Sequence, residues 1–224
     1  MATAQVLITE VRRVIHDESS PYRWSDLELI DYINAGMRQI VQLLPEANTI
    51  TSAVQLTNNL ARQVLPSGGI KFIKASHNFN DAGTVRSGTI RYAEKDALDT
   101  YDPDWETDVA IKADTDNFYL HYCHLSEEPK VYYMYPPCSA SKYIGLVYSK
   151  IPTALTAVGD TYGLDDEYIN AGITYVTYRA LTKEARDTLP DAYRNELWNN
   201  FLNTLGLEKE SKWKARPPAP PEGE

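Results

Sequence analysis

The chain has 224 residues, of which 43% are apolar and 24% charged, and its formal net charge is −9. Such a chain can bury a core without metals, and its acidic balance lacks the phosphate neutralisation by Lys and Arg that drives non-specific nucleic-acid binding. Two cysteines exclude a disulfide scaffold, and reduced thiols in a cytoplasmic compartment are the default expectation, with a single bridge as the alternative. We expect neither a signal peptide nor a membrane span.

The first part of the chain predicts two helices. Apolar residues at helical spacing predict one helix from Thr3 to about Asp17. Ser25 and Glu28 fit a capping box at the start of the second helix. Its apolar stripe reaches Leu44, and Pro45 ends it.

From Asn48 to about Thr161, short β-branched and aromatic runs alternate with Gly, Pro, Asn and Asp clusters, which is typical of strands and turns. The expected strands are Thr49–Leu56, Ala61–Leu65, Ile70–His77, Thr89–Tyr92, Asn117–His124, Lys130–Tyr135 and Tyr143–Ser149. The chain has 16 Tyr, which suit either an interface or a β-sheet, and composition does not decide between them.

Helical periodicity returns in the last part of the chain. It predicts one helix from Asp165 to about Ala185 and another that begins at Pro190. Residues 217–224 form a proline-rich tail that cannot bury a core and should be extended or disordered.

One short segment occurs twice, as Tyr32–Gly36 and again as Tyr168–Gly172. Its Ala and Gly would let two helices approach closely, although coincidence between two buried helices explains the repeat equally well. Either way, we expect the helices on both sides of the β region to pack together, because domain ends usually lie near each other.

These elements predict an α+β fold. Segments 1–47 and 163–216 would form a discontinuous bundle of about four helices. Residues 48–162 would form a long β-rich insertion, sandwich-like or barrel-like, and residues 217–224 the tail.

Residues that could bind a metal do not complete a site. His121, Cys123 and His124 lie close in sequence, but in a strand only the first two share a face, and no second pair has zinc-site spacing. An EF-hand loop counted from Asp102 lacks the Gly and Glu that it needs. We predict no metal and no cofactor.

Catalytic patterns are equally incomplete. The acidic run from Asp99 to Asp108 offers paired carboxylates for glycoside hydrolysis, but loop carboxylates are usually solvated turn formers. The Gly-rich segment 83–89 lacks the Lys of a phosphate-binding loop. We therefore predict no catalytic residue.

Two residue sets favour contacts with other proteins. The basic set near the end of the last helix either complements the helix dipole or docks on an acidic partner, with Trp213 as an anchor. Its members are Lys209, Lys212, Trp213, Lys214 and Arg216. The tyrosines of the third helix are a candidate neighbour or core surface, and they are Tyr168, Tyr175 and Tyr178.

Several segments, taken in order, carry a family resemblance. They are Arg23–Ile30, Tyr32–Gly36, Arg62–Pro66, Gly69–Ile73, Leu98–Asp99, Pro103–Trp105, Tyr133–Pro137, Tyr148–Pro152 and Tyr178–Ala180. Their order and spacing resemble the adaptor (head-to-tail connector) proteins of short-tailed bacteriophages, over roughly nine-tenths of the chain. Some relatives carry Lys-Asp at Lys183–Glu184, and the basic end and proline tail match least.

The resemblance implies a structural, non-enzymatic protein of the virion tail or neck, assembled in the host cytoplasm. It implies a homo-oligomeric ring, a dodecamer, seated beneath the portal protein and followed by a tail tube or nozzle protein. The ring would surround the DNA channel without sequence-specific binding, and no membrane is involved. The basic set would dock on the portal, and the tyrosine set would contact the next subunit.

Two other functional classes are also compatible with the sequence. A virion-associated, cell-wall-degrading glycosidase would need a carboxylate with a raised pKa in the acidic run. A DNA-packaging recognition protein would need a basic recognition helix, against which the acidic balance argues.

Overall fold

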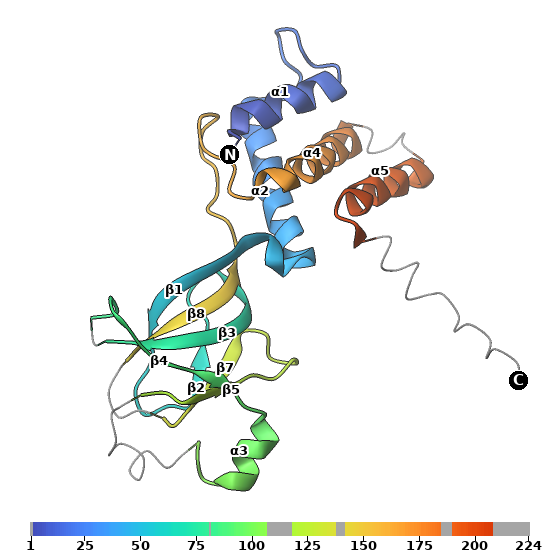
Figure 1. Cartoon of the computed structure of the whole chain (residues 1–224). Helices are drawn as coiled ribbons and strands as arrows, with labels where there is room; N and C mark the ends of the chain where they lie inside the picture. The colour runs from blue at the N-terminus through green and yellow to red at the C-terminus, as the bar shows by residue number, and fades with distance from the viewer. Residues whose placement is uncertain (1, 81, 107–117, 138–141, 185–189, 208–224) are drawn as a thin grey trace, which may run out of the picture. The chain divides into compact units, whose positions relative to one another are not determined.

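The computed structural model describes residues 2–80, 82–106, 118–137, 142–184 and 190–207 (Figure 1). Within them it contains five α-helices and two four-stranded sheets, which confirms the predicted α+β class. The chain divides into two compact units. We call Met1–Leu43 with Pro152–Glu224 the helical unit, and Leu44–Ile151 the β unit.

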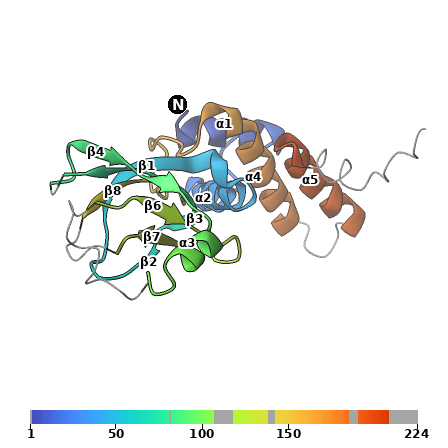
Figure 2. The same ribbon diagram turned by 60° about the horizontal axis from the view of Figure 1, so that its bottom comes forward.

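Helix α4 organises the helical unit. The unit contains α1 (Ala4–Val14), α2 (Asp26–Leu43), α4 (Ile169–Glu184) and α5 (Asp191–Thr204), with the short 3₁₀ helix η2 (Asp166–Tyr168) before α4. Helix α4 contacts α1, α2 and α5, and Figures 1 and 2 show it between α2 and α5. The predicted cap of α2 is present in part, since the Glu28 backbone N–H donates to Ser25 Oγ at 3.2 Å.

The two copies of the repeated segment occupy different surroundings. The Asn34 side chain is 8% exposed, donates to Leu155 O at 2.9 Å and accepts from Leu155 N at 2.7 Å. The equivalent Asn170 is exposed. A Cβ on Gly36 would lie 3.0 Å from the ring of Tyr175 in α4, so here the small residue does allow two helices to approach closely.

The β unit contains two open sheets that share a core. The first sheet has the order β1-β8-β3-β4 and the second β2-β7-β6-β5. Their bounds are β1 (Thr49–Gln55), β2 (Arg62–Val64), β3 (Gly69–Phe79), β4 (Arg86–Thr89), β5 (Arg91–Tyr92), β6 (His121–Cys123), β7 (Val131–Tyr135) and β8 (Tyr143–Lys150), and the 3₁₀ helix η1 (Pro45–Asn48) precedes β1. The barrel-like alternative is wrong for the described strands, because neither sheet closes on itself.

Strand β7 separates two layers of core. Successive side chains of a strand point to opposite faces. Tyr132 and Met134 belong to the core shared with the first sheet, while Val131 and Tyr133 belong to a second cluster with Leu98. The β unit therefore stacks the first sheet, the main core, the second sheet and a covering layer that holds α3 (Lys95–Tyr101).

Two details of the β unit differ from the prediction. The acidic run was expected in a loop, but its first part forms α3, in which Leu98 is buried. The single strand expected at Thr89–Tyr92 is divided between β4 of one sheet and β5 of the other. Buried Ile90 lies at the crossing, so the main core fixes the point where the chain changes sheets.

Candidate interaction surfaces

The predicted tyrosines of the third helix lie in two environments. Tyr175 is 6% exposed, and its ring packs against Phe201 of α5 with centroids 5.3 Å apart. Burial raises the pKa of the Tyr175 hydroxyl. Tyr168 and Tyr178 are only half-buried. Tyr175 thus belongs to the core of the helical unit, and the other two retain surface for a partner.

An aromatic surface joins α4 to α5. Tyr178 packs against Trp198 with ring centroids 5.5 Å apart, and Trp198 packs against Phe201 at 5.2 Å. A hollow beside them is lined by Tyr178, Arg194, Asn195 and Trp198. Half-buried Trp, Tyr and Arg side chains are the residues that most often carry the energy of a protein–protein contact. Sequence reasoning missed Trp198, although it lies one position beyond the apolar residue Leu197.

A second hollow lies between α2 and α4, and Tyr178 also lines it, together with Tyr32, Arg179, Thr182 and Lys183. Lys183 forms an ion pair with Glu28, and the Tyr32 hydroxyl donates to the same carboxylate at 2.8 Å.

These contacts change how Tyr32 and Glu28 ionise. The hydrogen bond from Lys183 lowers the pKa of Glu28. Burial, with the Glu28 carboxylate, raises the pKa of Tyr32 to about 12. The ion pair of Lys183 with Glu28 stabilises the contact between α4 and α2, and Arg179 beside it stays exposed.

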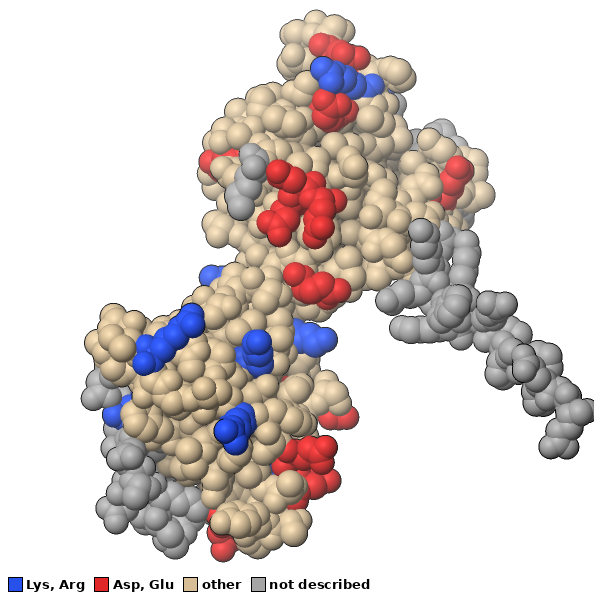
Figure 3. Space-filling model, viewed as in Figure 1, with Lys and Arg blue, Asp and Glu red and all other residues tan. Residues whose placement is uncertain are grey.

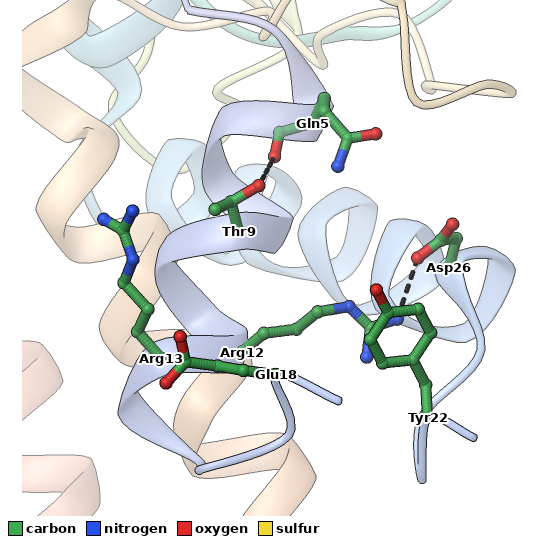
Figure 4. A pocket seen from close by; sticks show the side chains of 7 residues that line it. All are labelled: Gln5, Thr9, Arg12, Arg13, Glu18, Tyr22 and Asp26. Atoms are coloured by element: carbon green, nitrogen blue, oxygen red, sulfur yellow. Dashed lines mark hydrogen bonds and ion pairs between the residues drawn. The ribbon is translucent and has the colours of Figure 1, made fainter. Parts of the chain in front are cut away.

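A third pocket surrounds the buried Arg12 (Figure 4). Its guanidinium donates to Asp17 Oδ2 at 2.6 Å, to Trp24 O at 2.8 Å and to Asp26 Oδ1 at 2.8 Å. It also lies 3.9 Å from the ring centroid of Tyr22. Arg12 donates to two residues of the α1–α2 connection and to the first residue of α2, so these bonds stabilise the connection and the start of α2.

Of the residues with metal-binding potential, His121 and Cys123 lie in strand β6, and His124 directly follows that strand. Within the described ranges, no group of three or more His, Cys, Asp or Glu could hold an ion. Cys123 is 1% exposed, and burial raises the pKa of its thiol to about 11, which disfavours the nucleophilic thiolate. The ring of His124 packs against Phe72 at 5.3 Å. Cys138 lies outside the described residues.

The acidic run holds its covering layer together. Asp99 accepts from Trp105 Nε1 at 2.7 Å and pairs with Lys95 at 3.3 Å, and these bonds lower the pKa of Asp99. Lys95 pairs with Glu106 at 2.6 Å as well. A general acid for glycoside hydrolysis needs a raised carboxylate pKa, which is the opposite direction. Asp108 lies outside the described residues.

The basic set predicted to dock on a partner also falls outside the described residues. Its members are Lys209, Lys212, Trp213, Lys214 and Arg216. Among the helices that are described, none is both long and apolar enough to span a membrane.

The half-exposed aromatic and charged surfaces of this α+β protein suit contacts with other proteins. The chain belongs to the SU10 adaptor protein family, whose model matches residues 2–220. This match confirms the resemblance to phage head-to-tail adaptors and makes the chain a member of a structural protein family. No curated protein compared with the chain matches it.

Proposed function

We propose that this protein forms a ring, a dodecamer, beneath the portal of a short-tailed phage, joins the capsid to the tail and surrounds the DNA channel. The family match over residues 2–220 carries the proposal. In this role the protein stays in the neck of the virion and contacts the portal on one side and a tail tube or nozzle protein on the other. It needs no catalytic residue.

Three features support this role. The aromatic surface of Tyr178 and Trp198 offers contact area that the helical unit leaves half-exposed. The segment from Lys209 to Arg216 would provide a basic anchor for the portal. The net charge of −9 repels DNA, so a channel bounded by these subunits would pass DNA without retaining it.

Native mass spectrometry of the full chain, alone and mixed with portal rings, tests the proposal. We expect joint rings with one adaptor per portal subunit. A protein that stays monomeric and ignores the portal would contradict it. Removal of residues 208–224 should abolish portal binding, whereas unchanged binding would exclude the basic segment as the anchor.

A further inference from the structure

The first sheet of the β unit has an outer face of small and basic residues. Phe72 and Tyr148 are register partners, and both point into the main core. Their sequence neighbours therefore point outward. Pairing builds two cross-strand rows on this outer face, Thr49–Ser149–Lys71 and Thr51–Val147–Lys74.

The positive charge of this face has no compensation within the sheet. The strands β1, β3, β4 and β8 contain no Asp or Glu. Lys71 and Lys74 are exposed, and neither forms an ion pair with a described residue. Arg86 of β4 adds a third charge, and after burial, which is the larger cause, this charge also lowers the pKa of the His77 imidazole. Figure 3 shows Lys and Arg distributed over the β unit.

The layer that holds α3 has the opposite charge. Residues 94–106 include six acidic residues and one basic residue, Lys95, which is already paired with Asp99 and Glu106. Glu94 and Asp96 are exposed, and their carboxylates form no ion pair with a described residue. Because the main core and the second sheet separate this layer from the first sheet, the acidic and basic surfaces lie on opposite sides of one unit.

We propose that the outer face of the first sheet docks the acidic α3 side of the β unit in a second copy of this chain. Each subunit then offers a basic face to one neighbour and an acidic face to the other, which is the heterologous contact that a closed ring requires. Thr49 and Thr51 are small and exposed, so the partner can approach the sheet beside the exposed lysines, whereas Ser149 between the flanking strands is buried. The proposal rests on the ring proposed above and assigns its subunit contact.

Charge exchange on the full chain tests the contact. The sheet-face variant carries Lys71→Glu and Lys74→Glu, so both of its sides are acidic. The helix-face variant carries Glu94→Lys and Asp96→Lys, which leaves four acidic and three basic residues in 94–106 and removes most of the negative charge of that side. A control, Arg62→Glu with Lys130→Glu, makes the same charge change at exposed positions outside the first sheet and also removes the exposed ion pair of Arg62 with Glu128.

We expect native mass spectrometry to show about tenfold fewer rings, or none, for each face variant alone. In the sheet-face variant like charges meet at every contact, and in the helix-face variant most of the attraction at every contact is lost. An equimolar mixture of the two should restore rings in which the variants alternate. The control should assemble like the wild type, and added salt should weaken wild-type rings. Circular dichroism of each variant verifies that it is folded.

The outcomes separate the two proposals. Wild-type rings together with unimpaired face variants, or a mixture that stays unassembled, would overturn the contact and leave the ring intact. A wild type that never assembles, even with the portal, would overturn both. Rings that persist while the sheet-face variant alone loses duplex DNA binding would make the sheet a nucleic-acid surface instead.

Discussion

Truncation of Asn34 to Ala should destabilise the helical unit substantially. The change removes two hydrogen bonds to Leu155 and leaves the buried N–H and C=O of that residue without partners. Each lost bond removes about 0.5–1.5 kcal/mol, and each unsatisfied buried group costs about 1–3 kcal/mol where water cannot reach it. With partial relaxation, the free energy of unfolding should fall by about 2–4 kcal/mol.

The repeated segment supplies the matched control. Asn170→Ala makes the same chemical change at an exposed position of α4. Both variants gain about 0.5 kcal/mol of helix propensity, so their difference isolates the buried amide. Urea unfolding followed by far-ultraviolet circular dichroism measures it. Equal stability of the two variants, or an Asn34→Ala variant as stable as the wild type, would refute the role assigned to Asn34.

Three further changes test the other surfaces. Arg12→Met should cost about 3 kcal/mol of stability, because it leaves the buried carboxylate of Asp17 without its cation, and thermal unfolding measures the loss. Folding lowers the pKa of Glu28, so the stabilisation by its carboxylate is present above the ordinary value of 4.5 and is lost as the pH falls through the folded value. The difference in unfolding free energy between the wild type and Glu28→Gln should therefore vanish in acid. A difference that does not change with pH would contradict the ion pair with Lys183. Trp198→Ala should weaken ring or portal assembly about tenfold or more while the fold persists, as pull-down with portal rings would show.

Much of the secondary structure was predictable because its signals are local. The cap at Ser25 fixed the start of α2, and Pro45 fixed its end. The same locality explains what was missed. Helix α3 buries only Leu98, so it has no apolar stripe to detect. Glu28 was expected to complete the capping box, yet its side chain pairs with Lys183, which lies 155 positions away in sequence.

The candidate surfaces depended even more on tertiary structure. Tyr175 and Tyr178 of α4 look alike in sequence, yet Tyr175 is a core residue and Tyr178 is half-exposed. Only the way in which α5 packs on α4 determines how far each of them is buried. Likewise, Lys71 and Lys74 are unremarkable in sequence. They become a charged face once β8 pairs beside β3 and β1 pairs with β8, because neither β1 nor β8 contains an acidic residue.

The pairing of β1 with β8 also brings the two ends of the inserted β region together. The chain enters on β1 and returns on β8, with Thr49 opposite Ser149, and Asn48 donates to Lys150 O at 2.6 Å. The two ends of a segment of roughly a hundred residues, a common domain size, therefore meet within the width of one strand pair. When a short Gly-Ser turn joins Asn48 to Lys150 in place of residues 49–149, the helical circular dichroism signal of the remaining chain should persist. In the same way, a different domain inserted between Asn48 and Lys150 should leave the helices of this chain unchanged.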